Sequence, residues 1–271
     1  MALTVFDDVR LFVTDEGAGE PVLLVHGWGS DAGEWDQHVA ALAERHRVIA
    51  PDLRGHGRSS VPAAGNEPRA MAADLAALLH RLGTGPVVAI GHSMGAQVVS
   101  VLAVEHPSLV SALVTLDPGY GVVEAAAPYL AQVVEGLSGD DPTGTALAVE
   151  EWSFTPATAP AVRAAHRRRI AGTAPHVLAQ AFAGIFTAPG AFGLRPASEA
   201  YLARRARPVL SIWADAGRAA WEERLLTNPG SRVLAWPGAG HYLHEERPAE
   251  FLATVTGWLD SLMTEVLDGP T

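Results

Sequence analysis

An apolar run that ends in the pentapeptide Gly-His-Ser-Met-Gly, residues 91–95, constrains the fold more than any other feature of this sequence. The run begins at residue 86, and a helical pattern follows the pentapeptide, so we predict a buried strand, a sharp turn and a helix. Ser93 at the turn needs a strained backbone conformation, which Gly91 and Gly95 permit because they have no side chains to collide there. The G-x-S-x-G spacing alone is a weak signal, but between a strand and a helix it indicates a serine nucleophile exposed at a strand end.

Composition narrows the class of protein. With 271 residues, of which 48% are hydrophobic, the chain is long enough to bury one large core. Acidic residues number 30 against 19 basic ones, so we expect neither a nucleic-acid partner nor binding to an anionic membrane. Cys and Lys are absent, which excludes a thiol nucleophile, a disulfide, a cysteine-ligated metal and a lysine base. Because the N-terminal residues lack the apolar core of a signal peptide and no apolar stretch is long enough to span a membrane, we expect a cytoplasmic protein.

Short apolar runs alternate with longer helical patterns along the chain. The expected strands are residues 22–26, 48–51, 87–91, 109–116, 209–213 and 233–236, and the expected helices are residues 34–45, 68–82, 96–105, 218–226 and 248–267. Several of the apolar runs have no polar face, as in a parallel sheet that helices cover on both sides. The alternation therefore predicts an α/β fold with a doubly wound, mostly parallel sheet.

Residues 118–207 carry no convincing strand pattern. A structureless loop of that length is implausible in a compact domain, so we expect a helical cap inserted before the penultimate strand. The expected division is a core of residues 1–117 and 208–271 and a cap of residues 118–207, over the edge of the sheet where ligands bind. The candidate pocket residues are Trp28, Tyr120, Trp152, Phe154 and Phe186, although burial in the core of the cap itself is an equally good interpretation of such aromatic residues.

Four motifs in order along the chain resemble those of the α/β-hydrolase superfamily. They are HGWG at residues 26–29, DLRGHGRS at 52–59, GHSMG at 91–95 and GAGH at 238–241, each after an expected strand. The resemblance covers nearly the whole chain and implies the α/β-hydrolase fold. It says less about the reaction, because this fold supports many chemistries.

The resemblance also implies roles for individual residues. A serine hydroxyl is a poor nucleophile at neutral pH, so Ser93 needs a base, and His241 stands where the family carries its catalytic histidine. The backbone N–H groups of Trp28 and Met94 are the corresponding donors to the oxyanion. We expect His92 to shape the loops through hydrogen bonds, and His244 to lie near the surface.

Two residues are candidates for the acid that orients His241. Many relatives carry the acid after the penultimate strand, where Asp215 is present but stands two residues early. A subset of the superfamily, including certain lactonases, some dehalogenases and cofactor-free dioxygenases, carries it after the strand that precedes the cap. Asp117, followed by Pro-Gly, stands at that place, and we favour it over Asp215.

The sequence is compatible with three classes of function. The leading hypothesis is a serine hydrolase that cleaves a carboxylic ester or lactone of an apolar small molecule, aromatic ones included, through an acyl-enzyme, with no cofactor or metal. A cofactor-independent dioxygenase or a perhydrolase on the same fold is the second, although Met94 replaces the histidine that such dioxygenases carry after the serine. A non-catalytic receptor for a small molecule is the third, and an intact pair of Ser93 and His241 argues against it. The sequence leaves the substrate and the oligomeric state open.

Overall fold

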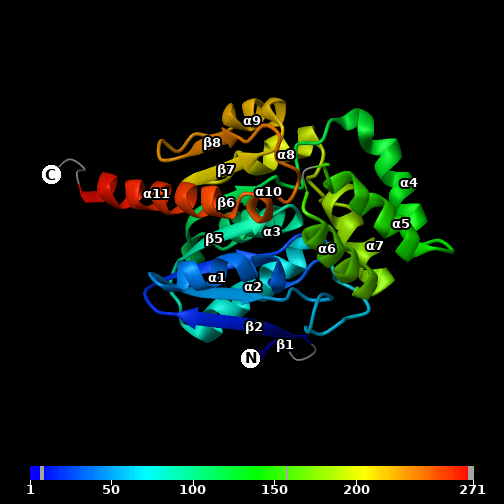
Figure 1. The fold of residues 1–271 in the computed structure, drawn as a ribbon, viewed down its shortest axis with the longest axis horizontal. Coiled ribbons are helices and arrows are strands. Elements are labelled where there is room, and N and C mark those ends of the chain that lie inside the picture. The colour runs from blue at the N-terminus through cyan, green and yellow to red at the C-terminus, as the bar shows by residue number, and fades with distance from the viewer. Residues whose placement is uncertain (7–8, 157, 268–271) are drawn as a thin grey trace.

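The computed structural model describes residues 1–6, 9–156 and 158–267. Within these ranges one eight-stranded sheet has the order β1-β2-β4-β3-β5-β6-β7-β8 (Figure 1). The strands are β1 (Ala2–Phe6), β2 (Val9–Gly17), β3 (Glu20–Val25), β4 (His46–Pro51), β5 (Val87–His92), β6 (Val110–Leu116), β7 (Val209–Trp213) and β8 (Arg232–Ala235). Strands β3 to β8 all run parallel to one another, which confirms the predicted mostly parallel α/β sheet.

The antiparallel strands β1 and β2 at one edge of the sheet are absent from the elements expected from the sequence. Strand β2 pairs antiparallel with both β1 and β4. Its buried residues Val9, Leu11 and Val13 alternate with more exposed ones. Such a strand buries only one face, so its pattern stands out less than the continuous apolar runs of the central strands.

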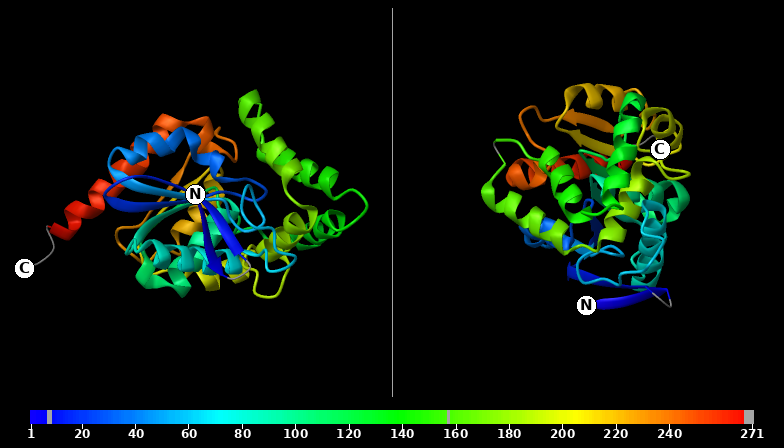
Figure 2. Two further views of the ribbon diagram at one scale, coloured as in Figure 1. Left: turned by 90° about the horizontal axis from the view of Figure 1, so that it is seen from below. Right: turned by 90° about the vertical axis from the view of Figure 1, so that its right-hand side faces the viewer.

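Helices cover both faces of the sheet. Helices α1 (Asp36–Ala43) and α11 (Pro248–Leu267) lie on one face, whereas α2 (Pro68–Leu82) and α3 (Met94–Glu105) lie on the other (Figure 2). In β3, the side chains of Val22 and Leu24 belong to the core beneath α1 and α11, and those of Leu23 and Val25 to the core beneath α2 and α3. The central strands are apolar throughout because both of their faces are buried. None of the described helices combines the length and the apolar composition that a membrane span requires.

The segment between β6 and β7 is helical, as predicted for a cap. It contains α4 (Ala127–Leu137), α5 (Pro142–Glu150), α6 (Pro160–Gly172), α7 (Pro175–Phe186) and α8 (Arg195–Leu202), and Figure 1 shows α4–α7 grouped beside one end of the sheet. Each of these helices has a proline in its first turn, where the missing N–H costs no intrahelical hydrogen bond. Leu130, Leu137, Ile170 and Phe182 belong to a core cluster that helices of this segment share.

The parallel strands bring the predicted motifs to one edge of the sheet. The loops that begin at His26, Ser93 and Asp117 follow β3, β5 and β6 directly. Strand β4 lies on one side of β3 and β5 on the other, so the chain reverses its direction across the sheet at this point. Open α/β sheets bind ligands at such a reversal, beyond the carboxyl ends of the strands.

The turn between β5 and α3 depends on the two glycines of the pentapeptide. A Cβ atom on Gly91 would lie 2.3 Å from the carbonyl oxygen of Gly95, and one on Gly95 would lie 2.2 Å from the carbonyl oxygen of Val25. Backbone atoms cannot move away as the end of a flexible side chain can. The start of α3 therefore sits directly against β3, and only glycine fits there.

This close approach predicts the effect of adding one methyl group. We expect Gly95→Ala to lower the free energy of unfolding by about 3 kcal/mol or to prevent folding, because the clash is with backbone. Gly257→Ala on α11 is the matched control: a Cβ there meets nothing within 4 Å, and we expect a gain of about 0.5–1 kcal/mol. Urea unfolding of both variants measures the difference, and equal stabilities would contradict the packing described for Gly95.

Candidate active site

Ser93 occupies the turn between β5 and α3 in a conformation that few residues other than glycine adopt. Its φ is 53° and its ψ is −115°. The backbone is held on both sides: the Ser93 N–H donates to the carbonyl of Leu116 at 2.9 Å, and its carbonyl accepts from the N–H of Gly119 at 3.0 Å. Hydrogen bonds to β6 and to the loop after it thus stabilise the strained backbone conformation of Ser93. The side chain is half-buried and lines a cavity of about 550 Å³.

His241 and Asp117 meet in the same cavity. The Nδ1 atom of His241 lies 2.6 Å from Oδ2 of Asp117, and the other carboxylate oxygen accepts the N–H of Ala214 at 3.1 Å. Asp117 has a φ of 34°, another positive value. Among the described residues no hydrogen bond joins Ser93 to His241, although both side chains line the cavity. Catalytic hydrogen bonds are often formed only when substrate is bound.

The charges of this pair follow from burial and from their contact. Burial by itself would raise the pKa of Asp117, but the hydrogen bond with His241 and the charge of Arg218 outweigh it, so the pKa is lowered and the carboxylate is ionised. Burial lowers the pKa of His241 below its usual value, against the opposing effect of Asp117. His241 is therefore neutral at pH 7. Because its Nδ1 faces the carboxylate, that nitrogen carries the proton and Nε2 has a free lone pair.

The other candidate acid, Asp215, lies elsewhere. It precedes α9 (Ala216–Glu223), and its carboxylate caps that helix by accepting the N–H of Arg218 at 2.7 Å. Asp215 is exposed, whereas Asp117 is buried against His241. The structure thus brings Asp117, and not Asp215, to the histidine.

The backbone N–H groups of Trp28 and Met94 have no acceptor among the described residues. Met94 is the first residue of α3, where the leading N–H groups of a helix lack intrahelical partners. The indole N–H of Trp28 donates to the carbonyl of Leu178 in α7 at 2.9 Å, and its ring meets that of Phe182. The loop after β3 is thereby tied to the helical segment above it.

The cavity wall agrees with part of the predicted pocket. Trp28, Trp152 and Phe186 line it, as expected from the sequence. Tyr120 and Phe154 do not. The hydroxyl of Tyr120 is buried against Glu222 at 2.9 Å, beneath the cavity, and the ring of Phe154 packs against Tyr242.

The rest of the wall was not predicted, because apolar helix residues give no sign in the sequence of which cavity they line. The unpredicted apolar residues of the wall include Val122, Leu130, Val149, Phe182 and Ile185.

Two ionisable groups of the wall also escaped prediction. Glu150 at the end of α5 is buried, and burial raises its pKa to about 7, although it accepts the hydroxyl proton of Tyr242. Arg218 lies beside Asp117, and its guanidinium donates to the carbonyls of Pro118 and Tyr120. Both groups are on elements that the sequence places far from Ser93, so only the fold reveals them.

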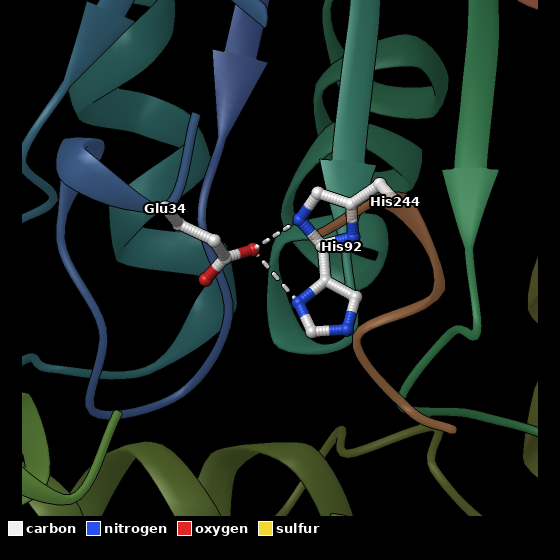
Figure 3. A group of neighbouring side chains, drawn as sticks. All are labelled: Glu34, His92 and His244. Atoms are coloured by element: carbon white, nitrogen blue, oxygen red, sulfur yellow. Dashed lines mark ion pairs between the residues drawn. The ribbon is translucent and has the colours of Figure 1, made fainter. Parts of the chain in front are cut away.

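A second group of polar side chains adjoins the cavity, which one of them, His92, lines. Glu34, His92 and His244 are fully buried, and Figure 3 shows both imidazoles facing one carboxylate. The expectation that His244 lies near the surface is therefore wrong; its ring packs against Trp35 under α11. Among the described residues this group alone has ligand atoms close enough to hold a metal ion. However, Nδ1 of His92 lies 2.8 Å from Oε1 of Glu34, a direct contact that an ion pair explains without a metal.

A larger groove, of about 880 Å³, lies apart from this site. Its wall combines residues of the loop before α1 with residues of α6, including Asp31, Arg58 and Arg169. Among the described residues of that wall there is no histidine to activate a nucleophile. The smaller cavity at Ser93 is therefore the candidate active site.

Comparisons with known proteins agree with this fold. Residues 20–248 match the family model for the alpha/beta hydrolase fold. Over 93% of its length the chain is 30% identical to 2-(acetamidomethylene)succinate hydrolase of Mesorhizobium japonicum, covering 92% of that protein. It is 40% identical to a soluble epoxide hydrolase of Corynebacterium sp. (strain C12), but this match spans only 43% of the chain and 41% of that protein.

Among solved structures, a thermophilic esterase from Thermogutta terrifontis, described as malate bound, superposes with a TM-score of 0.80. The two chains are 30% identical, and the match covers 93% of this chain and 94% of the esterase. The residues that the family model matches include β3 to β8, the turn at Ser93 and the loop of His241. This protein is a member of the alpha/beta hydrolase family.

Proposed function

We propose that this protein is a serine hydrolase that cleaves a carboxylic ester or lactone of an apolar small molecule through an acyl-enzyme. One observation carries the proposal: Ser93, on its strained turn, lines the same cavity as His241, whose Nδ1 lies 2.6 Å from the buried carboxylate of Asp117. A nucleophile, a neutral base and an acid that orients the base are the parts that acyl transfer requires.

In the proposed reaction His241 accepts the hydroxyl proton at Nε2 while Ser93 Oγ attacks the carbonyl carbon of the substrate. Asp117 holds the imidazole in the required tautomer and stabilises the imidazolium that forms. The imidazolium then protonates the departing alcohol oxygen, which leaves the acyl group on Ser93. Water, activated in the same way, attacks the ester carbon and releases the acid.

The negative charge that develops on the carbonyl oxygen needs donors. The N–H groups of Trp28 and Met94, which have no acceptor among the described residues, are the proposed ones. The positive end of the α3 dipole adds to their effect. Each such donor is worth about 3–4 kcal/mol of barrier in comparable enzymes.

Two features of the cavity support an uncharged, apolar substrate. Much of the wall is aliphatic or aromatic, and the exposed rings of Tyr129 and Trp152, which contact each other, line it as well. Arg218 is the single arginine of the described wall; its Nη2 donates to two backbone carbonyls, and its charge faces that of Asp117. The one arginine of this wall thus faces a carboxylate of the protein itself, which argues against a dicarboxylate substrate of the kind that the Mesorhizobium relative is named for. We propose residues 118–207 as the cap that supplies most of this apolar surface.

A serine nucleophile favours an acyl substrate over an epoxide. Attack of Ser93 on an epoxide carbon would give an ether, which water does not cleave, so the enzyme would not turn over. Attack on an ester or lactone gives an acyl-enzyme, which water does cleave. The proposal therefore follows the esterase among the similar proteins rather than the epoxide hydrolase.

The first test identifies the nucleophile. We expect a fluorophosphonate probe to label Ser93, and Ser93→Ala to lose hydrolysis of a p-nitrophenyl ester by several orders of magnitude while it folds normally. Mass spectrometry locates the label. A label on a different serine, or an active preparation that takes up no label, would contradict the proposal, as would oxygen consumption with a heteroaromatic substrate in place of hydrolysis.

The second test compares the two acids. Asp117→Asn is expected to reduce kcat by about 10⁴-fold, because an amide cannot stabilise an imidazolium as a carboxylate does. Asp215→Asn is the matched control: asparagine also caps helices, so activity and stability should change little. Both variants are assayed on one activated ester after circular dichroism has shown that they are folded. If Asp215→Asn loses activity while Asp117→Asn keeps it, the assignment of Asp117 as the acid is overturned.

The third test uses pH. Since His241 acts when neutral and burial lowers its pKa, kcat/KM should fall with decreasing pH only below about 6.5, the ordinary value for histidine. Glu150, whose pKa is about 7, also faces the cavity and can add an inflection near neutrality. Glu150→Gln removes that inflection and should keep the one that belongs to His241. If the Glu150→Gln profile is flat down to pH 4, His241 is not the base.

A further inference from the structure

One fully buried carboxylate contacts three of the four segments that form the proposed active site, those of Trp28, Ser93 and His241 but not that of Asp117. Glu34 lies in the short 3-10 helix η1 (Ala32–Trp35) and has no exposed surface. Its Oε2 accepts the N–H of Gly27, beside the proposed oxyanion donor Trp28, at 3.1 Å. Its Oε1 lies 2.8 Å from Nδ1 of His92, the residue before Ser93, and 3.4 Å from Nε2 of His244, three residues after His241 (Figure 3).

The contacts of His92 fit an imidazolium, because both of its ring nitrogens face acceptor oxygens. Its Nδ1 faces the Glu34 carboxylate, and its Nε2 lies 3.0 Å from the carbonyl oxygen of His241. A neutral imidazole has one N–H and one lone pair, so one of these two contacts would set a lone pair against an acceptor oxygen. The protonated ring carries an N–H at both nitrogens, one hydrogen-bonded to the His241 carbonyl and the other in ion-pair contact with Glu34. His92 therefore joins Glu34 to the backbone of the proposed base.

The electrostatic balance agrees with this assignment. Burial would raise the pKa of Glu34, but the charge of His92 outweighs it and holds that pKa well below its usual value. Burial would lower the pKa of His92, but the charge of Glu34 outweighs it and raises that pKa. Burial lowers the pKa of His244, which is therefore the neutral member of the group. A buried ion pair of this kind needs good partners on every side, because removing one leaves the other charge uncompensated.

We propose that Glu34 is a positioning residue of the active site: through its ion pair with His92 it holds the loop after β3, the turn at Ser93 and the His241 loop in their working arrangement. This inference rests on the proposed hydrolase function. Glu34 does not line the cavity, so it acts through Gly27, His92 and His244 and not on the substrate.

The ion pair of Glu34 and His92 also affects the pKa of the proposed base, His241. The rings of His92 and His241 lie 4.6 Å apart between centroids, so a positive His92 disfavours a proton on His241. Asp117 opposes this effect, and Arg218 adds to it. The titratable and charged groups that interact with His241 or His92 are Glu34, Asp117, Glu150, His166, Arg218, Tyr242, His244 and Glu245. Of these, Glu34 is the partner that keeps His92 charged.

The first experiment measures kinetics of Glu34→Gln. The amide cannot sustain the His92 cation, so His92 becomes neutral and one of its two acceptor contacts is lost. We expect kcat for a p-nitrophenyl ester to fall by about 10²-fold with little change in KM, because a misplaced catalytic group slows the chemical step more than it weakens substrate binding. With the neighbouring cation gone, His241 binds a proton more easily, so the acid limb of kcat/KM should move to higher pH.

Glu222→Gln is the matched control. Glu222 is equally buried and pairs with Arg205 at 2.7 Å; it contacts none of the segments of Trp28, Ser93 and His241, and it meets the loop after β6 only through the hydroxyl of Tyr120. This variant should lose stability as Glu34→Gln does, yet keep kcat and the acid limb of the wild type. If Glu34→Gln behaves like Glu222→Gln, the role of Glu34 is structural only and the proposal is overturned.

A second experiment uses the wild-type protein, so its result does not depend on whether a variant folds. Nitrogen-detected NMR of the histidine rings in the wild-type protein should show His92 as an imidazolium at pH 7, above the ordinary histidine pKa of about 6.5. A neutral His92 at pH 7, or one divalent metal ion per chain by elemental analysis, would overturn the ion pair. Both results are independent of turnover. A wild-type enzyme that is not labelled at Ser93 would instead refute the proposed function, and leave the ion pair to be judged by this spectrum.

Discussion

The contact between the turn at Ser93 and its two neighbouring strands is the constraint on which the rest of the site depends. On one side Gly95 lies against the carbonyl of Val25 in β3, and on the other Ser93 is hydrogen-bonded to Leu116 in β6. These contacts hold a backbone conformation that would be unfavourable in isolation. They also bring the loops after β3 and β6, with Trp28 and Asp117, to the two sides of the serine.

The charged groups around this turn are arranged so that each has a buried partner. Asp117 is ionised against a neutral His241, and Glu34 is ionised against a cationic His92 behind it. The two pairs meet where His92 donates to the His241 carbonyl. Low dielectric strengthens such contacts and makes an unpaired charge costly, so the same network that stabilises the loops also sets the charge of the proposed base.

Much of the fold was predictable because its main signals are local. The central strands are continuous apolar runs, and all of the predicted helices occur, with shifts of a few residues at their ends. Strands β1 and β2 were not predicted, because an edge strand with alternating burial resembles an ordinary polar segment. A helical segment between β6 and β7 was predicted without the bounds of its helices. Which of its residues reach the cavity depends on how α4–α7 pack together.

The sequence by itself determined the fold family and the positions of Ser93 and His241, because a strand followed by a glycine-flanked turn has few structural solutions. The tertiary structure decided what depends on distance across the sheet: that Asp117 rather than Asp215 meets His241, that Tyr120 and Phe154 point away from the cavity, and that Glu34 lies beneath it. The physical reason is that parallel strands bring together loops far apart in sequence. Side-chain contacts between those loops follow from strand order and register, which no local pattern specifies.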